Sequence, residues 1–155
     1  MTSEDIAAVS QIDAACFQEP WPKNSFAYEL TTDYSICMVA TTPEMGVAAA
    51  IIVWLIADEA HIATIAVHPD AQGQGVGACL LAHALLAAQQ RGAMTSMLEV
   101  RVSNFAAIAL YHRFGYHEVG IRKNYYQNNN EDALLLDLDQ IDPNELRNFL
   151  ALKCV

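Results

Sequence analysis

Residues 62–79 read Ile-Ala-Thr-Ile-Ala-Val-His-Pro-Asp-Ala-Gln-Gly-Gln-Gly-Val-Gly-Ala-Cys, and no other stretch says more about the structure. Its apolar first part, residues 62–67, predicts a buried strand, and the apolar run over residues 78–90 predicts a helix. Glycines at positions 73, 75 and 77 lie between the two. Because glycine has no Cβ atom, such a loop leaves backbone N–H groups accessible at the positive end of the helix. The pattern predicts a phosphate site, with a plain connecting turn as the alternative.

The composition restricts the class of protein and of partner. A length of 155 residues predicts one domain over residues 1–155, and a 54% apolar content is sufficient for one core. We expect neither a membrane span, because no apolar run reaches roughly 18–20 residues, nor a signal peptide, because the N-terminus is acidic. Eight basic against eighteen acidic residues argue against nucleic-acid binding and favour a cationic peptide or amine as partner.

The cysteines and histidines predict no metal site. Cys16, Cys37, Cys79 and Cys154 show neither CxxC nor CxxH spacing, and the five histidines are scattered. Cys37 and Cys79 lie in apolar runs, so we expect both to be small core residues. Without an export signal, a reduced cytoplasmic setting is expected.

Periodicity and turn residues predict a mixed α/β (α+β) fold, with helices on both faces of one sheet. The expected helices cover residues 3–17, 23–30, 78–90, 105–114 and a terminal segment from 142. The expected strands cover residues 34–40, 47–56, 61–67, 94–100, 116–121 and 133–138. The first three strands are joined tightly and predict an antiparallel meander. The fourth must run parallel to the third, because a helix connects them.

Ligands of open α/β sheets bind beyond the carboxyl ends of strands, where connections diverge. Two such ends are expected side by side here, after Val67 and after Val100. Glu99 is a carboxylate in an otherwise apolar strand, and it is either a general base or a solvated residue of an alternating strand. Tyr111 fits core packing, and Asn104 fits the N-cap of the following helix.

Segments on both sides of the glycine loop are similar to one enzyme family. Residues 72–77, Gln-Gly-Gln-Gly-Val-Gly, resemble the Gln/Arg-x-x-Gly-x-Gly/Ala signature of GCN5-related N-acetyltransferases (GNAT). Ile-Ala-Val-His-Pro-Asp at 65–70 precedes it, and Leu-Glu-Val-Arg-Val-Ser-Asn-Phe-Ala-Ala-Ile-Ala-Leu-Tyr at 98–111 follows. With Phe-Gly-Tyr at 114–116 and Ile-Arg-Lys-Asn-Tyr-Tyr at 121–126, the chain resembles the RimI branch, over residues 4–139. That branch acetylates the N-terminal alanine of a small-subunit ribosomal protein.

The resemblance implies acetyl-CoA as co-substrate, no metal, and a basic N-terminal peptide of a ribosomal protein as partner, in a monomer or weak dimer. It implies Glu99 as general base, Tyr111 as proton donor to the leaving thiolate, and Tyr125 and Tyr126 as contacts of the peptide. The implied CoA contacts are Ile65, Ala66, Val67, Gln72, Gly73, Gln74, Gly75, Val76, Gly77, Ala78 and Asn104.

The resemblance also implies a twisted, mostly antiparallel sheet whose central parallel strand pair is splayed at the CoA site. Two departures from the family are visible. Few residues precede the first helix, so the family's first strand is absent or vestigial here. Gly73 stands where arginine is common, so one phosphate charge is lost.

The expected chemistry suits an α-amine. Its reference pKa is about 7.7–8.0, so removing its proton near neutrality costs roughly 1 kcal/mol. A lysine amine, with a reference pKa of about 10.4, costs some 3–4 kcal/mol more. One carboxylate, acting directly or through a water, suffices for the α-amine.

Three other functions remain open on the sequence. The first is an acetyltransferase for a small amine or for a broad range of N-termini. The second is a dinucleotide-binding module, since residues 73–78 satisfy G-x-G-x-x-G/A with Glu99 about 20 residues on. The residues 68–72 between strand and glycines argue against it, because that motif follows its strand directly. The third is a CoA-binding domain without catalysis.

Overall fold

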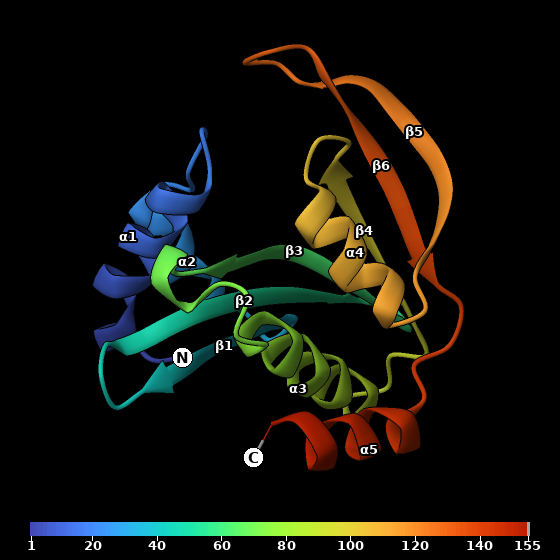
Figure 1. The fold of residues 1–155 in the computed structure, drawn as a ribbon, viewed down its shortest axis with the longest axis horizontal. Helices are drawn as coiled ribbons and strands as arrows, with labels where there is room; N and C mark the ends of the chain where they lie inside the picture. Colours follow the sequence, from blue (N-terminus) through green and yellow to red (C-terminus); the bar gives the residue numbers. More distant parts are fainter. Residues whose placement is uncertain (155) are drawn as a thin grey trace.

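The computed structural model describes residues 1–154, and its elements lie close to the predicted ones (Figure 1). The helices are the short 3-10 turns η1 (Ser3–Asp5) and η2 (Pro69–Ala71), and α1 (Ile6–Cys16), α2 (Lys23–Glu29), α3 (Val76–Gln90), α4 (Phe105–Arg113) and α5 (Pro143–Lys153). The strands are β1 (Ser35–Thr42), β2 (Gly46–Ile56), β3 (Glu59–Val67), β4 (Thr95–Arg101), β5 (His117–Tyr126) and β6 (Glu131–Leu138). No strand precedes α1 within the described residues, as we expected from the few residues before that helix.

Strand β5 is longer than predicted. We expected it to end at Ile121, because the charged and polar residues after it fit a loop, but it continues to Tyr126. Strand β6 begins at Glu131, so the two strands form a long hairpin whose turn covers residues 127–130. In Figure 1 this hairpin rises well beyond the rest of the sheet.

The strands form one mixed sheet in the order β1-β2-β3-β4-β6-β5. The first three strands form the predicted antiparallel meander, and β3 pairs with β4 in parallel. That parallel pairing extends only from Glu59–Thr95 to Ile62–Leu98. Beyond it, β3 continues to Val67 and β4 to Arg101 without pairing with each other, so the carboxyl ends of the two strands are splayed apart.

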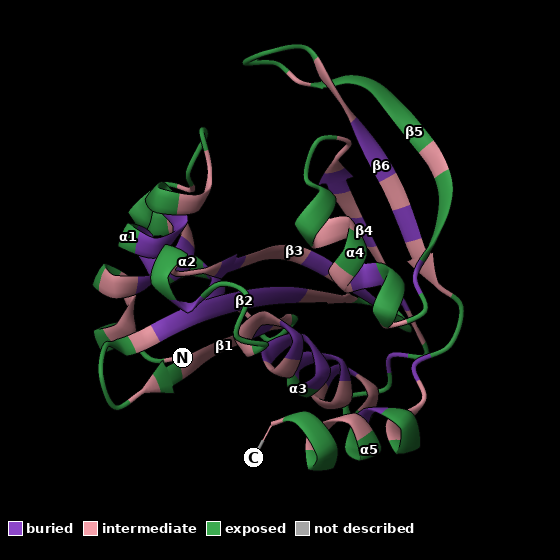
Figure 2. Cartoon of the chain, in the orientation of Figure 1, coloured by how far each residue is buried: buried purple, intermediate pink, exposed green. Residues whose placement is uncertain are grey.

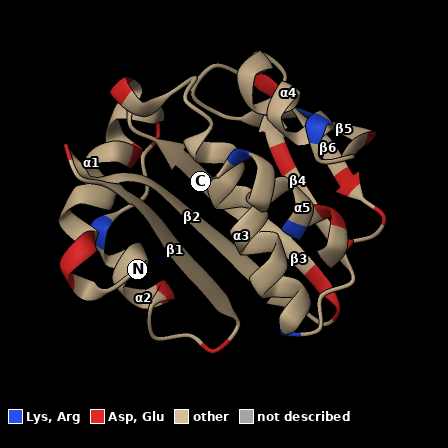
Figure 3. Cartoon of the chain, turned by 60° about the horizontal axis from the view of Figure 1, so that its bottom comes forward, with Lys and Arg blue, Asp and Glu red and all other residues tan. Residues whose placement is uncertain are grey.

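Strand β2 is buried on both faces, which explains its continuous apolar sequence. Ala49, Ile51 and Val53 belong to the larger core cluster, formed with α3, α4 and α5. Ala50 and Ile52 belong to a smaller cluster with residues of α1 and α2. Helices therefore cover both faces of the sheet, and Figure 2 shows the buried positions concentrated on α3 and the central strands. Helix α3 contains no Lys, Arg, Asp or Glu (Figure 3).

One cysteine prediction is wrong. Cys79 is not a small core residue, because it is only partly buried and forms a disulfide with Cys154, with a Cα–Cα distance of 5.8 Å. The reason is tertiary: α5 packs against α3, which brings the C-terminal end of the chain to the first turn of α3. Cys37 is a free, partly buried thiol packed against the smaller cluster. None of the helices between residues 1 and 154 has the length and apolarity to cross a membrane.

Candidate active site

The glycine loop enters α3 through a left-handed turn. Gly73 and Gly75 have φ angles of +74° and +85°, a region in which a side chain is strained. Nothing lies within 4 Å of a Cβ atom built on either residue, so the loop is open to a ligand. Gly75 is the N-cap of α3 and offers no side-chain acceptor to its first N–H groups. These N–H groups therefore stay available to an anion.

Side chains within the loop fix its path. Gln72 Nε2 donates to the Val67 carbonyl at 3.0 Å, and Gln74 Nε2 donates to the Asp70 carbonyl at 2.7 Å. Both glutamines therefore bind the protein's own backbone. Gly77 lies against β3, where a Cβ atom would approach Val67 Cγ2 to 3.1 Å. The small residue lets the first turn of α3 sit close to the end of the strand.

Residues 65–67 lie where β3 leaves β4. On one edge they pair with β2, and on the other edge they have no strand partner. Their free edge can align an extended ligand by strand-like hydrogen bonds. The Val67 carbonyl is already occupied, because Cys16 Sγ also donates to it, at 3.2 Å. A cavity of about 650 Å³ adjoins the loop on the β1 side, and Gln74, Gly75 and Val76 line it together with His83 and Lys153.

Glu99 lies on β4 just beyond the parallel pairing, with a side chain that is 20% exposed. Its Oε1 forms an ion pair with Arg122 Nη1 at 2.7 Å. The Tyr125 side chain also interacts with Glu99, and this hydrogen bond is the main cause that raises the pKa of Tyr125. The predicted base is therefore neither isolated nor simply solvated, because two residues of β5 engage it.

Tyr111 is buried on α4, with only 4% of its surface exposed. Its ring contacts that of Tyr116, with centroids 5.5 Å apart. Burial, and next the nearby Tyr126, raise the pKa of Tyr111 well above its ordinary value. The hydroxyl therefore keeps its proton at every physiological pH, as a proton donor must.

Tyr125 and Tyr126 end β5, with ring centroids 5.1 Å apart in an edge-on arrangement. Tyr125 is 43% exposed. The Arg101 guanidinium stacks over the Tyr126 ring at 3.7 Å from its centroid. Burial raises the pKa of Tyr126 to about 12, although Arg101 acts in the opposite direction. Tyr126 thus links the neighbourhoods of Tyr111 and Glu99, whereas Tyr125 faces solvent more.

Arg101 connects β4 to the turn of the hairpin, a role that the sequence did not reveal. Its guanidinium donates to Asn128, Asn129 and Glu131, at 3.1, 3.1 and 3.0 Å. Glu131 in turn accepts from the Ser103 N–H at 2.9 Å. This network holds the hairpin turn against the start of the α4 segment.

The same turn also contacts the loop on the opposite side of the splayed strands. Asn128 Nδ2 donates to Gln18 Oε1 at 2.7 Å, and Gln18 lies in the loop between α1 and α2. In Figure 1 that loop and the hairpin face each other across the splayed strands. The hydrogen bond therefore bridges the two sides above the open ends of β3 and β4.

Asn104 has the structural role expected from its position. Its Oδ1 accepts from the Ala107 N–H at 3.2 Å, so it is the N-cap of α4. The side-chain amide nitrogen has no partner in this cap and remains available for a ligand.

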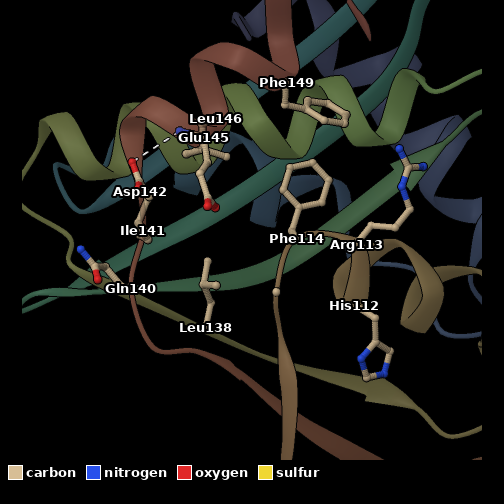
Figure 4. A pocket seen from close by; sticks show the side chains of 11 residues that line it. His112, Arg113, Phe114, Leu138, Gln140, Ile141, Asp142, Glu145, Leu146 and Phe149 are labelled. Carbon is tan, nitrogen blue, oxygen red and sulfur yellow. Dashed lines mark hydrogen bonds between the residues drawn. The ribbon is translucent and has the colours of Figure 1, made fainter. Parts of the chain in front are cut away.

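A second cavity, of about 440 Å³, contains none of the predicted site residues (Figure 4). It lies between the end of α4 and helix α5, with Phe114, Leu138 and Leu146 among its lining residues. The ring centroids of the two phenylalanines that line it, Phe114 and Phe149, are 5.0 Å apart. Across residues 1–154, no three His, Cys, Asp or Glu side chains are grouped to hold a metal ion.

Comparison with known proteins gives one consistent result. Residues 6–116 match the family model described as the acetyltransferase (GNAT) family. The ribosomal protein bS18-alanine N-acetyltransferase of Escherichia coli K12 is 38% identical over 140 residues, covering 89% of this chain and 93% of that protein. The N-alpha-acetyltransferase RimI of Mycobacterium tuberculosis is 34% identical over 148 residues, covering 92% of each. A crystal structure of the Escherichia coli S18-alanine enzyme superposes with a TM-score of 0.82 at 37% identity, covering 92% of this chain and 91% of that one.

Proposed function

The chain belongs to the acetyltransferase (GNAT) family and is thus an acyltransferase, and from this premise we propose that it acetylates the N-terminal alanine of a small-subunit ribosomal protein. Acetyl-CoA would be the acetyl donor, and the cytoplasm the place of reaction. The relatives that act on ribosomal protein bS18 support the substrate, since they match nearly the whole chain at 37–38% identity. The observation that carries the proposal is the separation of β3 and β4 at their carboxyl ends, where the open glycine loop follows β3 and Glu99 lies on β4.

The donor would lie along the free edge of β3. Backbone groups of residues 65–67 would align the pantetheine arm, and N–H groups of residues 73–78 would hold the pyrophosphate. Gln72 would act by fixing the loop through its bond to Val67. The Asn104 amide would add a contact from the start of α4.

The acceptor would be an extended peptide with its amine at Glu99. Glu99 would accept, directly or through a water, the proton that the nitrogen loses as the neutral α-amine attacks the thioester carbonyl. A C–N bond forms, the C–S bond breaks, and the electron pair leaves on sulfur. Tyr111 would donate a hydrogen bond or its proton to that sulfur as the bond breaks. Concerted donation is required, because the phenol is a weaker acid than a thiol with a reference pKa of about 8.5.

The hairpin and the loop between α1 and α2 would hold the peptide. Tyr125 and Tyr126 lie at the edge of the cleft, and their hydroxyls suit backbone carbonyls of an extended chain. The net charge of −10 favours the approach of a basic N-terminus.

A steady-state assay with acetyl-CoA tests the proposal. The acceptors are a peptide that starts Ala-Arg, the same peptide with a blocked N-terminus and an internal lysine, and a polyamine. We expect acetylation of the first only, located by mass spectrometry. Glu99→Gln should lower kcat by about 10²–10⁴-fold while leaving CoA affinity unchanged.

Glu118→Gln is the matched control, because Glu118 is exposed on β5 and does not share a sheet face with Glu99. Glu118 pairs with Leu136, which points into the core, whereas Glu99 pairs with Leu135, which points to the opposite face. It should behave like the unmodified enzyme. Preferred turnover of the polyamine would show that the acceptor is a small amine and not a peptide. CoA binding without any turnover would favour a non-catalytic domain. An unchanged kcat in Glu99→Gln would remove Glu99 as the base.

A further inference from the structure

The Glu99 carboxylate already has a cationic partner. Arg122 Nη1 lies 2.7 Å from Glu99 Oε1, and the Arg122 side chain is 54% exposed while that of Glu99 is 20% exposed. The guanidinium also lies 5.6 Å from the Tyr125 ring centroid. Figure 3 shows the acidic segment of β4 and the basic segment of β5 at the same end of the sheet.

We propose that Arg122 is a specificity-determining residue, which competes with a protonated amine for Glu99 so that the acceptor is taken up as the neutral amine. The inference rests on the proposed function, because it concerns the place at which the acceptor amine docks. The inference goes beyond that function, because it predicts that the site around Glu99 prefers a neutral amine to a protonated one.

The register of the sheet explains why Arg122 reaches Glu99. Arg122 and Arg101 lie in one row on either side of Ala133, and Glu99 lies in the adjacent row with Leu135. Strand β6 lies between β4 and β5, so the backbones of Glu99 and Arg122 are roughly 9–10 Å apart across the sheet, a distance that a long arginine side chain can span. The small Ala133 leaves the space between the strands open to both arginines.

The other charged and titratable groups around Glu99 do not take the place of Arg122. Arg101 is committed to Glu131 and to the hairpin turn. Tyr125 and Tyr126 both have a raised pKa and stay neutral near pH 7. An ammonium group that approaches Glu99 therefore meets the Arg122 guanidinium as its competitor.

The consequence depends on the pKa of the amine. Near pH 7.5 about a third of an α-amine is neutral, whereas only about one lysine side chain in a thousand is. A site that disfavours the ammonium form therefore binds α-amines in preference to lysine side chains. Because the Arg122 side chain is half exposed, solvent screens its charge, and the effect is moderate.

Two non-reactive peptides isolate this effect. One carries a trimethylammonium group at its N-terminus, and the other carries the neutral tert-butyl group of the same shape in its place. Neither can be acetylated. Their inhibition constants are measured at saturating acetyl-CoA, and their dissociation constants by calorimetry, for the wild type, Arg122→Gln and Lys123→Gln. Lys123 is the matched control, because it is the adjacent cation on β5 and pairs with Asp132 instead, at 2.7 Å.

In Arg122→Gln the charged peptide should bind about fivefold more tightly relative to the neutral one. Lys123→Gln should leave this ratio unchanged, and adding Glu99→Gln to Arg122→Gln should abolish the gain. An unchanged ratio in Arg122→Gln, an equal shift in Lys123→Gln, or a gain that survives the loss of Glu99 would each overturn the inference. Thermal melts of both single variants check that folding is intact.

The two proposals fail separately. If the wild type does not acetylate the Ala-Arg peptide, the proposed function is wrong, whatever the binding ratio. If it acetylates that peptide and the calorimetric ratio does not respond to Arg122, only the role of Arg122 is wrong.

Discussion

A buried hydrogen-bonded chain fixes the closed end of the parallel strand pair, and its energy can be measured. Tyr116 donates its hydroxyl to Ser96 Oγ at 2.6 Å, and Ser96 Oγ donates to the Ala60 carbonyl at 2.7 Å. Tyr116 and Ser96 are each only 2% exposed. Ala60 and Ser96 are themselves partners in the parallel pairing. The chain thus joins the segment after α4 to β4 and β3, just before those strands separate.

Tyr116→Phe removes one donor and leaves the bond of Ser96 to Ala60 intact. The cost should be about 1 kcal/mol in the free energy of unfolding. Ser96→Ala leaves the Tyr116 hydroxyl buried without an acceptor, which should cost about 1–3 kcal/mol. The double variant has no orphaned hydroxyl, so it should be about 1 kcal/mol more stable than the sum of the two single effects predicts.

Equilibrium denaturation in guanidinium chloride of the wild type, both single variants and the double variant gives the coupling directly. For a chain of this size, Tyr116→Phe should also lower Tm by roughly 2–4 °C. Acetyl transfer should not change, because the phenylalanine keeps the ring contact to Tyr111. Effects that add within about 0.3–0.5 kcal/mol would refute the reasoning, since the two hydroxyls would then be independent.

Three further predictions concern the loop, the cap and the hairpin. Gly75→Ala should lower the free energy of unfolding by roughly 1–2 kcal/mol, because φ is +85° there. Gly77→Ala should be near neutral, because the higher helix propensity of alanine offsets the close contact with Val67 Cγ2. Chemical denaturation of both variants checks this. Asn104→Asp should keep the N-cap and Tm, while Asn104→Ala should lower the free energy of unfolding by about 1 kcal/mol. Weaker CoA binding by the aspartate variant in calorimetry would identify the amide as a ligand contact. The pKa of Glu131 is lowered to about 2, mainly by its hydrogen bond from Ser103. The ionised Glu131 therefore stabilises the hairpin fully above its ordinary pKa of 4.5, and this stabilisation is lost as pH falls from there toward 2. Amide exchange of residues 126–131 across that pH range measures the loss, and equal protection at both ends would contradict the prediction.

The parts of the fold that local signals determine could be predicted from the sequence. The strand, the glycine loop and α3 follow each other within a few residues, and glycine and proline mark their limits. The parallel return of β4 follows from the helix that connects it to β3. The roles of Glu99 and Tyr111 remain predictions, because the structure places Glu99 at the splayed strand ends and buries Tyr111 on α4.

The parts that depend on distant residues could not be predicted. Between Glu118 and Gly120 the register of β5 shifts by one residue against β6. Without this bulge, Ile121 would share the face of Glu99 in place of Arg122, because one residue of slip exchanges the two faces. The ion pair at the base and the network of Arg101 therefore depend on a feature with no clear local signature. The same holds for the partner of Cys79, which is set by the packing of α5.

The bond between Cys79 and Cys154 also changes what proteolysis can do to this chain. It closes a loop with a sequence separation of 75 residues, which contains the hairpin with its exposed Asn-rich turn. In the chain-entropy account, closing a loop of this length destabilises the denatured ensemble by about 4.5 kcal/mol. A protease that nicks the turn would leave two fragments still joined, which migrate as one band on a gel until a reductant is added. A preparation that looks intact on such a gel can therefore carry a severed hairpin.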